Sequence, residues 1–212
     1  MRLRVEQMTR PMAFRRGFPL LAALIGCACA TSSVQRPTQV VTRDESGFTI
    51  TEEVRVGIAV RSDFKKALRL LEEEQLEQGI AALEEVTEAA PNLTAAHIDL
   101  GIAYRQAGNL ERAEESIAAA LALSPRHPVA HNELGIIYRR TGRFEQARAS
   151  YESALEKYPD FHFARRNLAI LCDLFLADLS CALEHYERYV QAMPQDEAAA
   201  MWVADLRNRA GR

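Results

Sequence analysis

Two histidines, His97 and His131, are the first side chains whose type and spacing suggest chemistry. They lie 34 residues apart, and neutral imidazole is a common metal ligand. Each stands three residues before a Leu-Gly pair, which indicates one repeated structural position. A side chain that recurs at one repeated position usually serves the packing of the repeat, so we interpret both as core histidines. His127 lies four residues before His131, but Pro128 follows it directly, so we expect a helix to begin between the two histidines.

No other pattern in the sequence points to catalysis. It contains neither a glycine-rich phosphate loop nor a Cys-x-x-Cys pair placed to bind zinc. The acidic runs 72–74 and 114–115 have basic neighbours at helical spacing, which is typical of solvated helix faces. The sequence therefore predicts a protein that is not an enzyme and uses no cofactor or metal.

The first 26 residues have the composition of an export signal. Five arginines precede an apolar run at 18–25, which is shorter than the roughly 20 residues that span a bilayer. A basic start before a short apolar core is typical of a secretory signal peptide. A start at Met12 would leave a complete signal, and Arg15-Arg16-Gly17-Phe18 also resembles a twin-arginine export signal.

The end of this signal has a specific pattern, Leu24-Ile25-Gly26-Cys27. It resembles the lipobox of bacterial lipoproteins, in which the Cys thiol receives a diacylglycerol and becomes the new N-terminus. The resemblance implies that Cys27 holds the protein to a membrane by acyl chains, at about 0.8 kcal/mol per buried methylene. Residue 28 is Ala rather than Asp, which in bacteria that sort by this residue implies the outer membrane, facing the periplasm. An ordinary signal peptide cut near residues 28–30 is the alternative.

Charge and composition describe the mature chain. The formal net charge is −3; removal of residues 1–26 takes away five Arg and one Glu, which leaves 21 basic and 28 acidic residues and a charge near −7. This balance argues against nucleic-acid binding. Residues 28–47 are polar and predict a tether. Apolar residues nearly alternate over 48–60, so we expect an extended segment there, and we assign 27–59 to a lipid-anchored linker with that segment.

A frame of 34 residues recurs after this linker. Its two clearest copies, 94–127 and 128–161, share Leu-Gly, a Tyr, two Ala and a Pro at the same offset. The shared residues are Leu100, Gly101, Tyr104, Ala113, Ala120 and Pro125, then Leu134, Gly135, Tyr138, Ala147, Ala154 and Pro159. The pattern resembles the tetratricopeptide repeat (TPR), a stacked helix-turn-helix unit. In both copies His replaces the usual Trp at the first position of the pattern.

The resemblance implies an all-α fold over 60–212. Weaker copies at 60–91 and 162–195 flank the central pair, and a last helix over about 197–208 would close the stack. We therefore expect a solenoid of about four units with a C-terminal capping helix. Gly101 and Gly135 would let the paired helix approach closely, while Gly108 and Gly142 would end the first helix of their units.

Cys172 and Cys181 leave two alternatives open. Cys172 lies at a core position of the fourth unit, where a buried thiol behaves as a small hydrophobe. A disulfide to Cys181, nine residues later, is the other alternative, because an oxidising periplasm would permit it.

The TPR resemblance also implies a binding groove along the first helices of successive units. An apolar floor with arginines around it would suit a protein or peptide that carries apolar and acidic groups. The alternative is that the arginines are ordinary surface charge and that the isoleucines pack against the N-terminal segment. The groove residues carried over from the family are Ile98, Ile102, Arg105, Asn132, Ile136, Arg139, Arg140, Arg166 and Ile170.

Together these features predict a non-catalytic, lipid-anchored periplasmic scaffold in a cell-envelope complex. The stretches 132–140, 164–171 and 182–189 resemble TPR proteins that accompany TonB-type energy-transduction systems. Two alternatives share the architecture: a pilotin-like assembly factor for a type IV pilus secretin, and an adaptor or regulator of a periplasmic protease or peptidoglycan enzyme.

Overall fold

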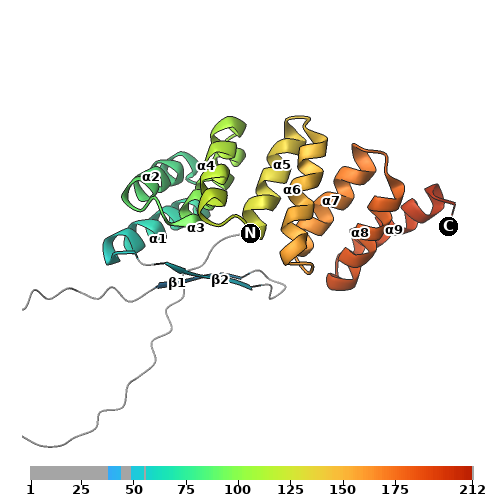
Figure 1. Cartoon of the computed structure of the whole chain (residues 1–212), viewed down its shortest axis with the longest axis horizontal. Helices are drawn as coiled ribbons and strands as arrows, with labels where there is room; N and C mark the ends of the chain where they lie inside the picture. The colour runs from blue at the N-terminus through green and yellow to red at the C-terminus, as the bar shows by residue number, and fades with distance from the viewer. Residues whose placement is uncertain (1–37, 44–48, 55, 212) are drawn as a thin grey trace, which may run out of the picture.

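The computed structural model describes residues 38–43, 49–54 and 56–211. Within them, nine helices follow one another in a row of paired helices, preceded by one β-hairpin (Figure 1). The helices are α1 (Ile58–Glu72), α2 (Leu76–Ala89), α3 (Thr94–Gln106), α4 (Leu110–Leu123), α5 (Pro128–Arg140), α6 (Phe144–Lys157), α7 (His162–Leu174), α8 (Leu179–Ala192) and α9 (Glu197–Arg209).

The stack has the expected arrangement of four helix pairs and one closing helix. In each pair the two helices pack together, and the second helix also contacts the first helix of the next pair, up to α8 against α9. The expected all-α solenoid with a capping helix is confirmed. On α9, Val203 is buried and the Trp202 ring lies 5.4 Å from that of Tyr186, which fixes the cap to the fourth unit.

The sequence analysis predicted one strand of the hairpin and not the other. Strand β2 (Thr49–Val54) lies in the expected extended segment, but it pairs antiparallel with β1 (Thr38–Arg43), which the sequence analysis assigned to the tether. The tether prediction is wrong for these six residues, whose polar composition hides a strand that is stabilised by pairing. The alternation also does not extend to 60, because α1 begins at Ile58.

The turn between the two helices of each unit uses the same backbone conformation. Gly108 and Gly142 have φ of +82° and +76°, as expected for glycines that end a helix. The equivalent residues of the outer units are Glu74, at +60°, and Ala177, at +53°. The outer units therefore keep the left-handed turn without the residue that adopts it at least cost.

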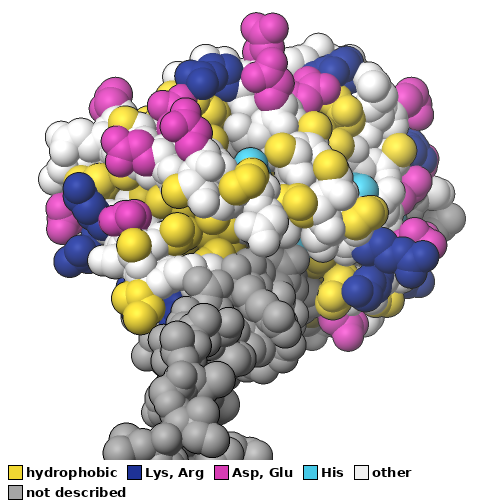
Figure 2. Space-filling model, turned by 60° about the vertical axis from the view of Figure 1, so that its left-hand side comes forward, with side chains coloured by type: hydrophobic (Ala, Val, Ile, Leu, Met, Phe, Trp, Pro, Cys, Tyr) yellow, Lys and Arg dark blue, Asp and Glu magenta, His cyan; other side chains and the backbone are white. Residues whose placement is uncertain are grey.

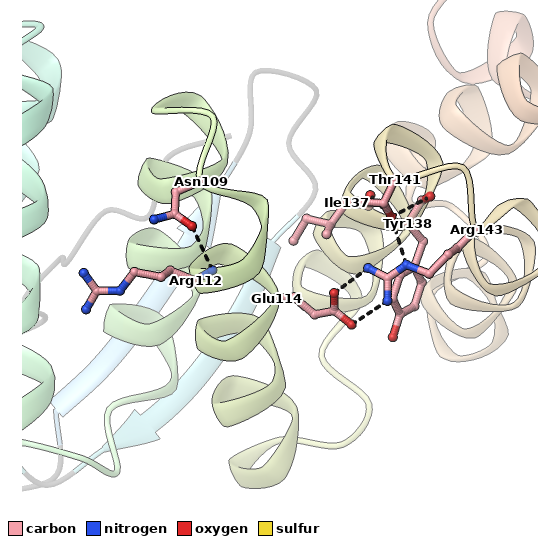
Figure 3. A network of polar contacts seen from close by, with 7 residues as sticks. All are labelled: Asn109, Arg112, Glu114, Ile137, Tyr138, Thr141 and Arg143. Carbon is pink, nitrogen blue, oxygen red and sulfur yellow. Dashed lines mark hydrogen bonds and ion pairs between the residues drawn. The ribbon is translucent and has the colours of Figure 1, made fainter.

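Ion pairs join neighbouring units. Figure 3 shows Arg143, at the start of α6, donating to the carboxylate of Glu114 on α4 through its two terminal guanidinium nitrogens. The same guanidinium lies 4.2 Å from the ring centroid of Tyr138. Arg112 on α4 pairs with Glu84 on α2 at 2.8 Å. About a third of each side chain of the Arg143–Glu114 pair is exposed, so such a pair contributes roughly 0.2–1 kcal/mol and mainly fixes how units meet.

Candidate functional site

The first helices of the central units form one continuous face. Helix α3 contacts α5, and α5 contacts α7, in addition to the contacts that each makes within its own pair. Ile102, Ile136 and Ile170 recur on these helices at 34-residue intervals, and all three are half-buried. We call the surface around these three isoleucines the inner face.

All nine residues that the sequence analysis assigned to a groove lie on α3, α5 or α7, but they differ in accessibility. Arg140 is exposed, whereas Ile98 and Asn132 are buried, with 0% and 5% of their surface accessible. The remaining six, Ile102, Arg105, Ile136, Arg139, Arg166 and Ile170, are half-buried. In this structure Ile98 therefore supports the inner face from beneath and offers no surface to a partner.

A chain of hydrogen bonds links the three helices across the inner face. The Nε of Arg105 on α3 lies 2.7 Å from a carboxylate oxygen of Glu133 on α5. Asn132 donates to Glu133 at 3.4 Å and accepts from Asn167 on α7 at 2.9 Å. Arg140 donates to the backbone carbonyl of Arg105 at 2.9 Å. These contacts hold the helices in register and neutralise Arg105 within the chain.

Sequence reasoning missed the pairing of Arg105 with Glu133. The two residues are 28 positions apart, six fewer than the repeat length. Glu133 therefore lies in the middle of α5, whereas Arg105 lies near the end of α3. A comparison of charges at this offset would have found the pair. Glu133 is 6% exposed, and its carboxylate is held between Arg105 and Asn132.

Three other arginines of the inner face have no acidic partner in the described part of the chain. Among the described residues, no carboxylate lies within ion-pair distance of Arg139, Arg140 or Arg166. The guanidinium of Arg139 lies 5.6 Å from the ring centroid of Phe175, and that of Arg166 lies 5.5 Å from Trp202. The aromatic rings orient these cations without neutralising them.

Exposed hydrophobic side chains occur on the elements beside these arginines. Leu174 ends α7 and is 68% exposed, Phe175 follows it at 41%, and Met201 on α9 is 71% exposed. The C-terminal part of the stack thus offers cationic and apolar groups together.

On the face of the molecule shown in Figure 2, acidic and basic side chains are interspersed around hydrophobic ones, so the charge there is mixed.

Helix α3 also carries a buried acidic side chain. Asp99 on α3 is 4% exposed, and its Oδ2 has no hydrogen-bond partner. Burial raises the pKa of this carboxyl well above its usual range, and the charge of Glu133 raises it further. The sequence analysis did not single out Asp99, because a lone Asp in a helix carries no signal of burial.

The two histidines that first suggested chemistry have a repeated structural role. The Nε2 of His97 lies 2.9 Å from the carbonyl oxygen of Pro91, and that of His131 lies 2.8 Å from that of Pro125. Arg165, at the equivalent position of the next unit, donates to the carbonyl of Pro159. These side chains thus fasten each unit to the exit of the preceding one. Both histidines have a main-chain partner but are only half-buried, so the interpretation of them as core histidines is corrected to that extent.

A third histidine, His127, is buried and caps α5. It is 3% exposed, and its Nδ1 accepts a hydrogen bond from the backbone N–H of Ala130 at 3.4 Å. Burial, together with the nearby charges of His131 and Lys157, lowers the pKa of His127 to about 4. The ring is therefore neutral at physiological pH, as its acceptor role requires.

The structure settles the alternatives for the cysteine pair. Cys172 in α7 and Cys181 in α8 form a disulfide, with their α-carbons 5.9 Å apart. Asp178 lies between them and caps α8 by accepting from the backbone N–H of Cys181 at 3.0 Å. Because the two sulfur atoms are bonded to each other, they lack the thiolate charge that a metal would need.

A polar hollow of about 300 Å³ lies between α2, α3 and α4. Its polar groups largely satisfy one another, since the hydroxyl of Tyr104 donates to Glu84 and Arg112 pairs with the same carboxylate. We therefore interpret it as part of the packing between the first two units.

No helix in the described part of the chain has both the length and the apolar character needed to cross a membrane.

Comparison with known families identifies the repeated unit. A family model described as a tetratricopeptide repeat matches residues 64–128, 98–161 and 132–173, which together run over more than half of the chain. The chain belongs to the tetratricopeptide-repeat family. TPR folds are generally non-catalytic scaffolds for protein–protein interaction, and no catalytic family is identified in this chain.

Solved structures of other TPR proteins resemble this one. A structure of Pseudomonas aeruginosa pilF is 23% identical, with a TM-score of 0.66 over 72% of this chain and 69% of pilF. MamA from Desulfovibrio magneticus RS-1 is 19% identical, with a TM-score of 0.64 over 73% of this chain and 87% of that one. A TPR protein of Thermus thermophilus is 23% identical, with a TM-score of 0.60 over 69% and 80%. At these identities the likeness concerns the fold alone. No curated protein matches the sequence.

Proposed function

We propose that this TPR protein is a non-catalytic, lipid-anchored scaffold on the periplasmic side of a bacterial outer membrane. It binds a protein partner along the inner face and holds it within a cell-envelope complex. The observation that carries the proposal is a group of three arginines, Arg139, Arg140 and Arg166, which form no ion pair with any described residue and lie beside a row of half-buried isoleucines. Unpaired guanidinium groups bind carboxylates strongly and with defined geometry.

Two observations support the location. The pattern that ends at Cys27 favours lipidation, although it lies outside the described residues. The disulfide between Cys172 and Cys181 favours an exported protein, because such bonds persist in the periplasm and are rare in the cytosol.

The alternative roles share this architecture and differ in the partner. The TM-scores to pilF and to MamA, 0.66 and 0.64, are nearly equal, so the likeness does not favour a pilotin-like role over others. A TonB-type system and a periplasmic protease or peptidoglycan enzyme supply the other candidate partners. Crosslinking in intact cells, followed by identification of the captured protein, distinguishes these roles.

A charge-reversal experiment tests the inner face itself. The variant Arg139→Glu/Arg140→Glu is compared with Arg69→Glu/Arg126→Glu, which makes the same charge change at two exposed arginines outside the inner face. After crosslinking and pull-down from detergent-solubilised membranes, we expect the first variant to lose the partner and the second to retain it. Both should keep the helical circular dichroism of the wild type. Full partner recovery by a folded Arg139→Glu/Arg140→Glu protein would refute the proposal.

A further inference from the structure

We infer that one side of α1 lies against the membrane surface, with its lysine and arginine side chains on the phosphate groups of anionic lipids. The inference rests on the proposed function, because the lipid at Cys27 would bring α1 to that surface. Figure 1 shows α1 and α9 at opposite ends of the row of helices. The stack would therefore extend away from the membrane, with α9 at its far end.

The side of α1 in question consists of exposed residues at helical spacing. They are Ile58, Ser62, Lys65 and Arg69. Because they follow one another at intervals of four, three and four residues, they lie on one side of the helix. Lys66 is also exposed and lies at the edge of this side, whereas the buried Phe64 and Ala67 lie on the opposite side. We call this exposed surface the outer side of α1.

The corresponding side of the later first helices is buried. At the 34-residue offset, Lys65 corresponds to Asp99 on α3 and to Glu133 on α5, which are 4% and 6% exposed. Glu133 contacts Arg105 of the preceding unit, so this side faces backward along the stack. In the part of the chain that the structure describes, no helix precedes α1. Its outer side therefore ends the stack, and the end of a solenoid must be polar.

That requirement does not explain the sign of the charge. Helix α1 has four basic and two acidic residues, a net charge of +2, although the whole chain has a net charge of −3. No other described helix exceeds +1, and α2 has four acidic residues and no basic one. Lys65, Lys66 and Arg69 form no ion pair with any described residue. The outer side is therefore a cationic surface on an acidic protein.

The other charges near this surface do not cancel it. Asp63 lies toward one edge of the outer side, and Glu72 is the last residue of the helix. Arg61 is half-buried and donates to the carbonyl of Val56 at 3.4 Å. The acidic residues of α2 lie one helix further from a surface that touches α1. Packed helices lie about 8–10 Å apart, which is about one Debye length at physiological salt, so repulsion from α2 is largely screened.

An apolar side chain lies among the cations. Ile58 is 84% exposed, the highest value among the large hydrophobic residues that the structure describes. Basic residues around an apolar one are typical of surfaces that bind a membrane interface. Each Lys or Arg near an anionic membrane strengthens binding about fivefold. In a lipid-anchored protein the contact is intramolecular, so a few cations are sufficient to hold α1 at the surface.

Reconstituted vesicles test this inference. The full-length protein is purified from membranes with its lipid and inserted into vesicles of phosphatidylcholine alone, or with about a third of anionic phosphatidylglycerol. A fluorophore that responds to polarity is attached at Ser62→Cys to report the outer side of α1, or at Asn208→Cys, an exposed position of α9, to report the far end. Both variants also carry Cys29→Ser, so that the new thiol alone takes the label. Flotation of the vesicles measures anchoring separately.

We expect the label at Ser62→Cys to shift its emission to the blue on phosphatidylglycerol vesicles and not on pure phosphatidylcholine. The label at Asn208→Cys should not shift on either. Molar salt should abolish the shift, because the Debye length falls to about 3 Å.

Charge variants identify the residues responsible. With the label at Ser62→Cys, the variant Lys65→Gln/Arg69→Gln should lose the shift. Arg126→Gln/Lys157→Gln, which removes two exposed cations outside α1, should keep it. All four positions are exposed, so both variants should retain the circular dichroism of the parent protein.

A protein that floats with the vesicles but shows no shift at Ser62→Cys would overturn this inference and leave the anchor intact. A shift that persists in Lys65→Gln/Arg69→Gln would also overturn it. So would a shift on pure phosphatidylcholine that grows with protein density, which would assign the outer side to a second copy of the chain. A protein that floats with neither vesicle would overturn the anchor and this inference together.

Discussion

The ring of Tyr151 lies against the α-carbon of Gly135, so that a Cβ at position 135 would stand 2.6 Å from Cδ1 of the ring. Tyr151 is fully buried in α6, and Gly135 lies in α5. In the preceding unit, a Cβ at Gly101 would meet Ile117 at a similar distance. The separation of the two helices in each central unit thus depends on a missing side chain.

Replacing Gly135 with Leu should therefore destabilise the fold by about 1–3 kcal/mol through overpacking. Ala149→Leu, which adds the same side chain at an exposed position of α6, should change the free energy of unfolding by less than about 0.5 kcal/mol. Urea unfolding followed by circular dichroism measures both. A wild-type midpoint for Gly135→Leu would mean that the helices do not approach at this residue.

Ala177→Gly should stabilise the protein. Ala177 has φ of +53°, a conformation that costs an L-residue about 1–2 kcal/mol, while glycine loses roughly 0.5–1 kcal/mol more backbone entropy on folding. The expected net gain is about 0.5–1 kcal/mol in the free energy of unfolding. Gly142→Ala, at φ of +76° in the preceding unit, is the matched reverse change and should destabilise. A loss of stability in Ala177→Gly would contradict the left-handed turn.

His127 should make the fold sensitive to mild acid. Its pKa is about 4 in the folded protein and about 6.5 in an unfolded chain, so the unfolded chain takes up the proton first as the pH falls. The stability gained from neutral His127 is complete above about pH 6.5 and is lost progressively toward pH 4. It amounts to roughly 2–3 kcal/mol.

His127→Asn keeps a side-chain acceptor at the cap and removes the titration. The free energy of unfolding of this variant should fall less steeply between pH 6.5 and pH 4 than that of the wild type. Other titrating groups are common to both proteins, so the difference reports His127. Parallel curves would mean that the imidazole is not buried in its neutral form.

Reduction of the disulfide should loosen the fourth unit. The bond between Cys172 and Cys181 closes a short loop, for which the chain-entropy model gives about 2–3 kcal/mol. Dithiothreitol should lower the urea midpoint of the wild type and leave that of Cys181→Ala unchanged. A wild-type midpoint that does not respond to the reductant would contradict this contribution.

Cys27→Ser should release the protein from membranes, because serine cannot form the thioether to a diacylglycerol. Fractionation of cells and labelling with radioactive palmitate measure the two consequences. Cys29→Ser, two residues away, is the matched control and should remain in the membrane fraction. Continued membrane association of Cys27→Ser would contradict lipidation at this residue.

The sequence was sufficient to predict the repeated fold because its signals are local and periodic. Gly101, Gly135, Gly108 and Gly142 each have a conformational or packing requirement that few other residues meet, and the 34-residue offset repeats those requirements. The hairpin was not predicted in full, because β1 is short and polar and is stabilised by a partner strand rather than by its own pattern.

The candidate site was predictable in outline only. Its helices and its isoleucines follow from the repeat, but the state of each charge depends on neighbours from other units. Arg105 is neutralised by Glu133, whereas Arg139 is not neutralised by any described residue, although both arginines occupy the same position of the repeat. Burial of Asp99 likewise depends on the assembled surface.

The contact between the fourth residue of a unit and the proline carbonyl before it has a consequence for how the chain can change length. His97 and His131 bind main-chain oxygens, which every proline supplies regardless of the unit around it. Excision of residues 94–127 would bring the carbonyl of Pro91 to His131 in place of that of Pro125. The same contact can therefore join any two units of this kind, so a stack that is one unit shorter or longer would keep it.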